Sequence, residues 1–326
     1  MQSILGIDVS KDTLDTILLI DGRRYHKVFD NDLKGYRYFE KWLIEHQAGQ
    51  VHACLEATGQ YGEEIAEYLY DRKHKVSVVN PARIKRYGQS KLHRNKTDKA
   101  DAKLISEFCW KEKPAPWKPL NPEIKHLRAV VRRLHDLKAQ LHQENNRLKS
   151  GEKDPWVLDD LTLHVKFLQS RIKAAENEIK EIIKQSETLR KQHDLLTSIP
   201  GIGLLTAATL LGEIGDFSGF ESAPQLAAYA GLNPTSHRSG SSVFKKTRVS
   251  KEGRSELRSC LFMPAIVAIT WNPVVKDLSE RMLKSNHHKM EIVVAAMKKL
   301  LHLAYGVLKT QKPFDPNYGA QFNFSS

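Results

Sequence analysis

The sequence predicts an α/β domain followed by mainly helical regions, and three observations support this fold class. Short strand patterns come first and then alternate with helix patterns over the first hundred residues. A proline-rich stretch, residues 114–119, ends that alternation. Apolar residues then recur at three- and four-residue spacing, which is typical of long helices. We therefore predict an α/β domain over 1–113, a linker with coiled-coil helices over 114–193, and a mainly helical carboxyl-terminal domain over 194–326.

The composition indicates a protein that binds nucleic acid. The 326 residues include 51 Lys and Arg against 38 Asp and Glu, which gives a formal net charge of +13. This charge is spread along the chain, and nucleic acid is the usual partner of such a surface. The sequence has no positively charged leader and no run of about 18 apolar residues, so we expect a cytoplasmic protein with no membrane partner. Cys54, Cys109 and Cys260 are widely spaced, which predicts reduced packing residues rather than a zinc site or a disulfide framework.

The first hundred residues predict a sheet with helices. Two apolar runs joined by Ser10-Lys11-Asp12 are typical of a β-hairpin. The later elements alternate between strand and helix, which is typical of an α/β sheet domain. The expected elements are strands at 4–9, 13–20, 25–29, 51–56 and 76–79, and helices at 33–46 and 61–71.

Two acids occupy unusual positions in these strands. Asp8 lies between Ile7 and Val9 in a strand that we expect to be buried, where an isolated carboxylate is costly. Glu56 closes a later strand, at the carboxyl end where open α/β sheets place their sites. A metal ion is one partner that would offset the burial of these charges.

Asp98 and Asp101 lie three residues apart at the start of an apolar helical pattern. This spacing puts both on one helix face, close enough to share a divalent cation. Eight Lys or Arg surround these two acids between residues 83 and 103, so a polyanion would be drawn to the same place. The alternative is that Asp98 is a helix N-cap or a first-turn acid and that the basic side chains are simply solvated.

Four acids in this order are the pattern of ribonuclease-H-like nucleases. Two cations about 3.5–4 Å apart activate the attacking oxygen and stabilise the leaving one, and about four carboxylates are needed to hold them. The residues concerned are Asp8, Glu56, Asp98 and Asp101. The alternative makes each acid a separate cap or turn residue.

The middle of the chain predicts two long helices separated by a break at residues 149–155. The apolar seams run from Ile124 to Leu141 and from Leu168 to Leu189. The two helices could pair with each other as an antiparallel hairpin or pair with another copy of the chain. The functional interpretation is a dimerisation or spanning arm, and the alternative is an ordinary helical core.

The carboxyl-terminal domain begins with a glycine-rich turn. Residues 198–203, Ser-Ile-Pro-Gly-Ile-Gly, have the form of a helix-hairpin-helix turn, in which backbone N–H groups approach a phosphate. The alternative is a turn that packs two helices without touching DNA. Further helices are expected at 256–268 and 289–305.

A loop rich in serine and glycine follows at residues 236–242. Between Arg238 and Arg258 there are seven Lys or Arg against two Glu, so a hydroxyl in this loop lies in a positive field and could attack a phosphodiester. Composition by itself favours a polar loop that only contacts backbone phosphate. The basic residues expected to bind nucleic acid are Arg83, Lys85, Arg86, Lys91, Arg94, Lys96, Arg238, Lys245, Lys246, Arg248, Lys251 and Arg254.

These motifs together resemble the insertion sequence 110 family of transposases, the bridge-RNA-guided recombinases. The stretches that carry the resemblance are 6–8, 56–59, 78–82, 95–98 with Asp101, 198–203 and 239–242. The resemblance implies a RuvC-like domain whose four acids bind Mg²⁺, and a nucleophilic serine, which by motif position is Ser239, with Ser241 as the alternative. It also implies donor and target DNA as substrates, a noncoding bridge RNA as guide, and homodimers that assemble into a tetramer.

Two other functions remain open. A junction-resolving endonuclease would use the same four acids with water as the nucleophile and would need no serine. A non-catalytic nucleic-acid-binding protein would keep the basic surface and need none of the acids.

Overall fold

The computed structural model describes residues 3–57, 59–91, 97–235, 238–239, 243–244, 248–250 and 253–317. The chain forms two compact units, Met1–Pro119 and Leu120–Ser326. Within the described residues no single helix is long and apolar enough to cross a membrane. One bent pair, Ser255–Trp271 with Pro273–Lys284, meets that test by length and composition only.

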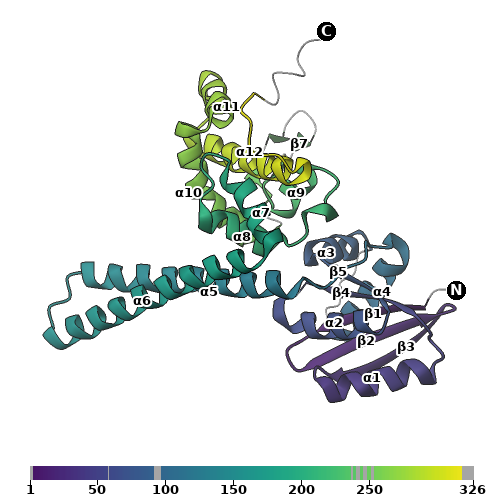
Figure 1. The fold of residues 1–326 in the computed structure, drawn as a ribbon. Coiled ribbons are helices and arrows are strands. Elements are labelled where there is room, and N and C mark those ends of the chain that lie inside the picture. Colours follow the sequence, from purple (N-terminus) through teal and green to yellow (C-terminus); the bar gives the residue numbers. More distant parts are fainter. Residues whose placement is uncertain are drawn as a thin grey trace, which may run out of the picture. The chain divides into compact units, whose positions relative to one another are not determined.

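The first unit contains a five-stranded mixed sheet, as the α/β pattern predicts (Figure 1). The strand order is β3-β2-β1-β4-β5, in which β1 pairs antiparallel with β2 and parallel with β4. The strands are β1 (Ser3–Val9), β2 (Thr13–Ile20), β3 (Arg23–Asp30), β4 (Val51–Glu56) and β5 (Lys75–Val79). The predicted hairpin of β1 and β2 is therefore confirmed, because six residue pairs from Ile4↔Leu19 to Val9↔Leu14 are in register.

Helices cover both faces of this sheet. Side chains alternate along each strand, so Leu5 and Ile7 pack on one face while Ile4 and Gly6 lie on the other. The first face is covered by α1 (Leu33–Glu45) and α2 (Glu63–Asp71), which follows the short 3₁₀ helix η1 (Gly59–Gly62). The second face is covered by α3 (Pro81–Ser90) and α4 (Asp98–Glu112).

Helix α3 was not predicted from the sequence. Only Ile84 and Gly88 of its ten residues are buried, so the apolar periodicity that reveals a helix is almost absent. The start of the helix is nevertheless well defined: the Asn80 side chain accepts a hydrogen bond from the Ala82 N–H, and Pro81 occupies the first helical position.

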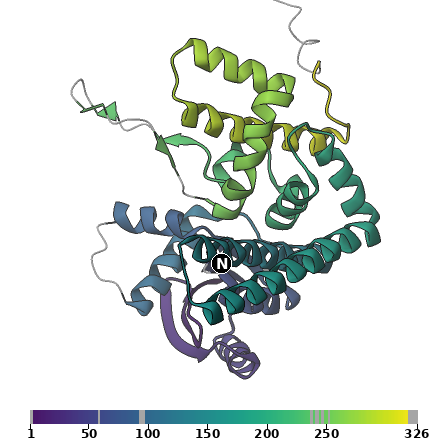
Figure 2. The same ribbon diagram turned by 90° about the vertical axis from the view of Figure 1, so that its left-hand side faces the viewer.

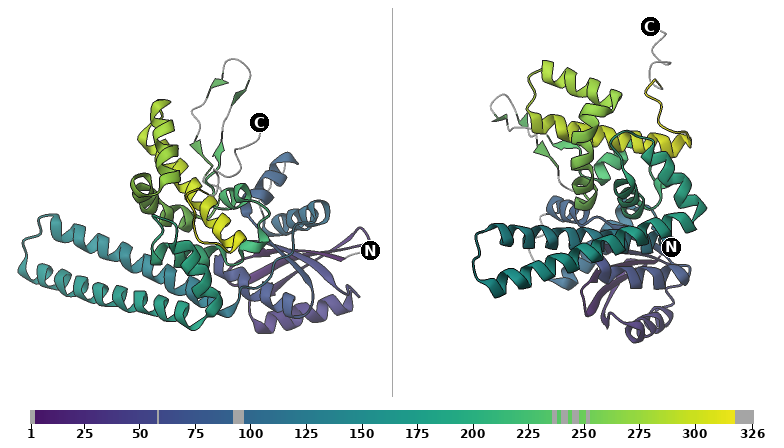
Figure 3. Two further views of the ribbon diagram at one scale, coloured as in Figure 1. Left: turned by 45° about the horizontal axis from the view of Figure 1, so that its top comes forward. Right: turned by 60° about the vertical axis from the view of Figure 1, so that its left-hand side comes forward.

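The second unit begins with two long helices that lie side by side (Figures 1 and 3). These are α5 (Pro122–Lys149) and α6 (Pro155–Gln185). The seam of α5, which includes Leu127 and Leu134, belongs to one apolar core with Leu168 and Ile179 of α6. The two seams are therefore buried against each other within one chain, as in the hairpin alternative.

The second seam was predicted to run through to Leu189 as one helix, but the helix breaks at Ser186. The backbone of this residue is extended, and its hydroxyl accepts a hydrogen bond from the Leu189 N–H, so Ser186 is the N-cap of a new helix, α7 (Glu187–Thr197). The apolar spacing continues across the break, which explains why the pattern alone did not reveal it.

The remaining helices pack on the same core (Figures 1 and 2). They are α8 (Leu204–Ile214), η2 (Phe217–Gly219), α9 (Ala223–Tyr229), α10 (Ser255–Trp271), α11 (Pro273–Lys284) and α12 (Lys289–Thr310). Between α9 and α10, the described residues form two short antiparallel strand pairs: β6 (Pro234–Thr235) with β9 (Arg248–Val249), and β7 (Arg238–Ser239) with β8 (Val243–Phe244). Within the predicted loop at 236–242, Arg238 and Ser239 form β7, and its other residues lie outside the described ranges.

Candidate active site

Asp8 lies on the sheet face that α4 covers. A Cβ atom added to Gly6 would be 2.3 Å from the carbonyl oxygen of Ala102 and 2.4 Å from the backbone nitrogen of Ser106, so the backbone of α4 rests directly on Gly6. Asp8 is two residues further along the same strand and therefore points to the same face. The glycine thus allows the first turns of α4 to lie close to Asp8.

Those first turns carry Asp98 and Asp101. The N-cap of α4 is Thr97, whose hydroxyl oxygen accepts a hydrogen bond from the Ala100 N–H at 3.2 Å. Asp98 is therefore not the N-cap, but it is a first-turn acid, which is the other form of that alternative. Both aspartates lie in the first turn, three residues apart, where the helix dipole favours a negative charge.

The register of the sheet brings two more acids beside Asp8. Ile7 pairs with Leu55 across the parallel strands, so Glu56 follows directly next to Asp8 on the neighbouring strand. On the other side, Asp15 of β2 is the antiparallel partner of Asp8 itself. Paired residues of adjacent strands point to the same face.

Asp15 is a residue that the sequence reasoning missed. The nitrogen Nε2 of His26 lies 2.7 Å from the Asp15 carboxylate, across strands β2 and β3. Its position could have been found by counting outward from the hairpin turn, because Val9 pairs with Leu14 and the next pair is Asp8 with Asp15.

The electrostatics show that the aspartates are close enough to interact. Burial raises the pKa of the Asp8 carboxyl to about 6, with further increases from the negative charges of Asp101, Asp98 and Asp15. We refer to Asp8, Asp15, Glu56, Asp98 and Asp101 as the acid cluster. The structure therefore places Asp98 and Asp101 near enough to Asp8 for their charges to interact, and places Glu56 in the adjacent register position.

The acid cluster has the chemistry of a site for a hard divalent cation. Its donors are all carboxylate oxygens, and a cation would offset the repulsion that raises the pKa of Asp8. Over the described ranges, no three His, Cys, Asp or Glu side chains stand close enough together to form a complete set of metal ligands as placed. Metal binding at the acid cluster therefore requires the carboxylates to draw together around the cation.

The predicted basic residues next to the acids fall into three groups. Arg83, Lys85 and Arg86 have exposed side chains on α3. Lys91 instead forms an ion pair with Glu107 of α4, which also accepts a hydrogen bond from Arg24 at 3.0 Å. Arg94 and Lys96 lie outside the described residues.

In the second unit, Ser239 lies in β7 next to Arg238, and Arg248 lies in β9. Arg254 is partly buried and contacts Glu213 and Tyr229. Four further predicted residues lie outside the described ranges, namely Ser241, Lys245, Lys246 and Lys251. The roles assigned to all these side chains remain predictions.

The glycine-rich turn at 198–203 joins α7 to α8. Gly201 has φ +104°, and a Cβ atom there would be 2.9 Å from the Ala268 Cβ and 3.0 Å from the Pro264 carbonyl oxygen of α10. The side chain of Asn272 donates a hydrogen bond to the Pro200 carbonyl at 3.1 Å. The turn therefore packs helices together, as its alternative interpretation requires, and contact with DNA remains a prediction.

Comparisons with known proteins identify both units. Residues 193–280 match the family described as "Transposase IS116/IS110/IS902 family", and residues 5–151 match a transposase domain of the DEDD type from IS110 elements. The chain is also 35% identical over 317 residues to the pilin gene-inverting proteins of Moraxella bovis and Moraxella lacunata, an overlap that covers 96% of this chain and 98% of each relative. An insertion element IS110 protein of Streptomyces coelicolor is 28% identical over 152 residues, which is 46% of this chain and 37% of that protein.

These matches span nearly the whole chain and agree with the fold. The five-stranded sheet with helices is the ribonuclease-H-like DEDD domain, which implies a divalent metal ion, and a mainly helical region follows it. The family is one of enzymes that cleave and transfer strands of DNA. The chain belongs to the IS116/IS110/IS902 family of transposases.

Proposed function

We propose that this transposase cleaves and rejoins donor and target DNA under the guidance of a noncoding bridge RNA, with Mg²⁺ at the acid cluster and Ser239 as the nucleophile. The observation that carries the proposal is the convergence of acids on Asp8, whose pKa is raised by burial and by Asp101 and Asp98. Such a cluster is expensive in a folded protein unless a cation is bound there in the working enzyme.

Asp8, Glu56, Asp98 and Asp101 are the residues that would hold the metal. Bound Mg²⁺ would supply Lewis-acid polarisation of a phosphodiester oxygen and would favour a deprotonated nucleophile. The side chains of Asp8 and Glu56 come from rigid adjacent strands, and those of Asp98 and Asp101 from the capped first turn of α4. Elements of this kind position a site more accurately than a loop does.

The serine step conserves the energy of the phosphodiester bond. The Ser239 oxygen forms a new ester bond to phosphorus, the bond from phosphorus to a deoxyribose oxygen breaks, and the serine proton ends on that leaving oxygen. A second strand can then attack the phosphoserine link and release the serine, so that recombination needs no external energy source. Arg238, Lys245 and Lys246 would hold the DNA backbone nearby. Delivery of Ser239 to the acids by another subunit is our preferred arrangement.

One relative favours a specific kind of rearrangement. The Moraxella bovis protein is a pilin gene-inverting protein and aligns with 96% of this chain. Inversion of a DNA segment and insertion of an element both require two cleaved sites and an exchange of strands. We therefore propose that this chain can act on two sites within one DNA molecule as well as on separate donor and target molecules.

Several partners belong to this proposal. The net charge of +13 supports the binding of a bridge RNA together with two DNA molecules. Simultaneous action at two DNA sites supports homodimers that assemble into a tetramer. The α5–α6 hairpin is long enough to reach another subunit, since a helix rises about 1.5 Å per residue.

The experiment combines the full chain, Mg²⁺, RNA transcribed from the DNA beside its gene, and labelled DNA from the ends of the element. Denaturing electrophoresis follows cleaved strands and protein–DNA adducts in the parent, Ser239→Ala, Ser241→Ala and Asp98→Asn. We expect an adduct in the parent and in Ser241→Ala, and neither adduct nor cleavage in Ser239→Ala and Asp98→Asn.

Other outcomes separate the alternatives. Loss of the adduct only in Ser241→Ala moves the nucleophile by two residues. Cleavage in both serine variants with no adduct means that water is the nucleophile, as in a junction-resolving endonuclease. Cleavage that is independent of added RNA contradicts the guided mechanism.

A further inference from the structure

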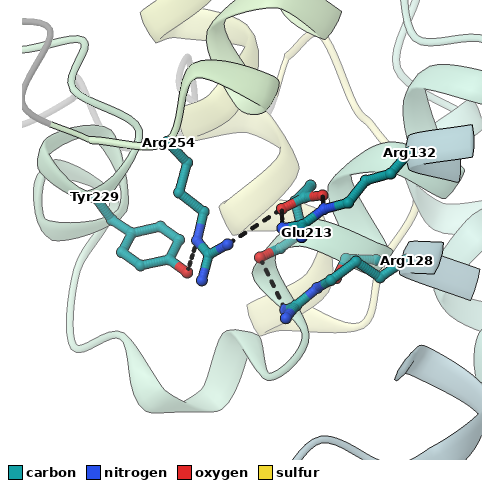
Figure 4. Close-up of polar contacts among 6 residues, drawn as sticks. Arg128, Arg132, Glu213, Tyr229 and Arg254 are labelled. Carbon is teal, nitrogen blue, oxygen red and sulfur yellow. Dashed lines mark hydrogen bonds and ion pairs between the residues drawn. The ribbon is translucent and has the colours of Figure 1, made fainter. Parts of the chain in front are cut away.

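A buried carboxylate in the second unit joins segments that are far apart in the sequence (Figure 4). Glu213, in the last turn of α8, is 1% exposed. Arg132 of α5 donates two hydrogen bonds to it, from Nε at 2.6 Å and from Nη2 at 2.9 Å. Arg254, the residue before α10, donates a third from Nη1 at 3.3 Å. Glu213 therefore links α5, α8 and the start of α10.

Glu213 is held in its charged form. Burial acts to raise the pKa of this carboxyl, but the hydrogen bond and charge of Arg132, with the charges of Arg254 and Arg128, outweigh burial and lower the pKa below its usual value. A buried charge that loses one partner is strongly unfavourable, so the geometry of the three side chains is tightly constrained.

The position of Glu213 relative to α5 is fixed by the backbone as well. Arg128 donates hydrogen bonds to the carbonyl oxygens of Gly212 at 2.7 Å and Glu213 at 3.3 Å, at the end of α8 where carbonyls lack helical partners. A Cβ atom on Gly212 would be 3.1 Å from the Arg128 Cα. Helices α5 and α8 therefore meet closely at this point, and the backbone of Glu213 is held in a fixed position relative to α5.

Arg254 connects Glu213 to the segment 234–253, which we call the serine segment because it contains Ser239. The Nε of Arg254 donates to the Tyr229 hydroxyl (Figure 4). The backbone N–H of Arg254 also donates to the Tyr229 carbonyl at 3.1 Å. Next to it, Gly253 has no room for a side chain, since a Cβ atom would be 2.4 Å from the Tyr229 carbonyl oxygen. The end of the serine segment is therefore attached to the end of α9.

The beginning of the serine segment is attached at the same place. Pro234 pairs with Val249, and the Ser250 N–H donates to the Asn233 carbonyl at 3.0 Å. Arg258 donates to the carbonyl oxygens of Ala230 and Gly253, at 2.9 and 3.0 Å. Both ends of the serine segment thus lie together beside Arg254. We call this place, residues 229–235 and 248–254, the base of the serine segment.

We propose that Glu213 is a positioning residue for strand transfer: through Arg132 and Arg254 it fixes the base of the serine segment to helices α5 and α8. This inference rests on the proposed function, in which the serine segment supplies the nucleophile. Displacement of a reacting group by about 1 Å can reduce a rate about 100-fold, so a link at the base of the segment controls the reaction without touching DNA.

The first measurement needs no DNA. Hydrogen exchange by mass spectrometry on the full chain compares the parent with Glu213→Gln and with Glu144→Gln. Glu144 is a matched control, because it is also a buried carboxylate but lies in α5, away from the base of the serine segment. Its partners are Arg147 and His164. We expect exchange about tenfold faster at residues 229–235 and 248–254 in Glu213→Gln only, with α5 unchanged.

The second measurement is the rate of adduct formation with labelled element-end DNA, guide RNA and Mg²⁺. In Glu213→Gln we expect a rate about 100-fold lower at saturating DNA, with the DNA dissociation constant unchanged. Arg254→Lys keeps the positive charge but loses the fork that joins Glu213 to Tyr229, so we expect the same loss of rate at saturating DNA and the same faster local exchange in this variant. In Arg254→Lys, Arg132 still pairs with Glu213, so the Arg254→Lys variant supplies the test if Glu213→Gln does not fold.

Two results overturn the inference: unchanged exchange at the base of the serine segment, or faster exchange with a parental rate of adduct formation. Failure of the proposed nucleophile is distinguishable from both. If Ser239→Ala forms the adduct at the parental rate while Glu213→Gln slows it and speeds local exchange, the nucleophile is another residue and the positioning role of Glu213 is upheld.

Discussion

At the scale of single residues, Asp8 shows how the acid cluster lowers the folding stability of the metal-free chain. Its carboxyl lies in a half-buried strand position, and burial together with Asp101, Asp98 and Asp15 raises its pKa to about 6. A carboxyl whose pKa is higher in the folded chain than in the unfolded chain lowers the free energy of unfolding once the pH rises above its pKa in the unfolded chain. The metal-free chain therefore carries this penalty at neutral pH.

Removal of the Asp8 charge should stabilise the metal-free chain while abolishing strand cleavage. In the presence of EDTA, we expect Asp8→Asn to increase the free energy of unfolding by about 1 kcal/mol, a value reduced for solvent screening. This change should raise Tm by about 2–4 °C. Added Mg²⁺ should raise the Tm of the parent but not that of the variant. Asp12→Asn, which changes an exposed acid in the turn after β1, is the control and should leave Tm unchanged. A lower Tm for Asp8→Asn in EDTA would contradict repulsion within the acid cluster.

At the scale of secondary-structure elements, the contact between β1 and α4 decides where the acids meet. Gly6 permits the backbone of α4 to approach, and Asp98 and Asp101 reach Asp8 only because of that approach. The Thr97 cap fixes where α4 begins and so which residues form its first turn. One glycine and one cap therefore position two of the five residues of the acid cluster.

Gly6→Ala should push α4 away from the sheet. Because the added methyl group would meet backbone atoms of Ala102 and Ser106, we expect a loss of about 1–3 kcal/mol in the free energy of unfolding, and weaker stabilisation by Mg²⁺. Chemical denaturation with and without Mg²⁺ measures both effects. Gly306→Ala is the control, because its Cβ would meet nothing within 4 Å and alanine favours the helix by about 1 kcal/mol. Equal behaviour of the two variants would mean that α4 does not depend on the close approach at Gly6.

At the scale of the whole molecule, the positive charge is the dominant property. A chain with a net charge of +13 attracts nucleic acid of any sequence, so this charge by itself does not select a site. Arg83, Lys85 and Arg86 are exposed on α3, the helix that precedes Asp98 and Asp101 in the chain. Contact of these side chains with a phosphate backbone is a prediction of the proposed function.

DNA binding should be strongly salt-dependent. We expect affinity to fall by about 10³–10⁵ between about 50 and 200 mM salt if about 6–10 phosphates are contacted. Lys85→Gln should reduce the slope of log affinity against log salt by about 0.9, since one phosphate contact is lost. Lys41→Gln, on α1 at the opposite face of the sheet, should not change the slope. Fluorescence anisotropy at several salt concentrations measures these slopes, and a slope near zero would rule out the electrostatic interpretation of the basic residues.

Local sequence patterns determined much of the fold. Short apolar runs predicted β1, β2 and β4. Apolar spacing of three and four predicted α5 and α6, because residues at that spacing share one helix face. Asp8 and Glu56 stood out as candidate site residues because charges inside strand patterns contradict ordinary packing. Asp98 and Asp101 stood out because their spacing puts two acids on one face at a helix start.

Only the tertiary structure decided which distant residues meet. Asp15 joins the acid cluster through strand register, and helix α3 formed where the sequence shows almost no apolar period. Glu213 reads in the sequence as an ordinary acid near a helix end, yet its partners lie 81 residues before it and 41 residues after it. Such pairings depend on how helices cross and how closely their backbones approach, and these are properties of the packed chain that no local pattern encodes.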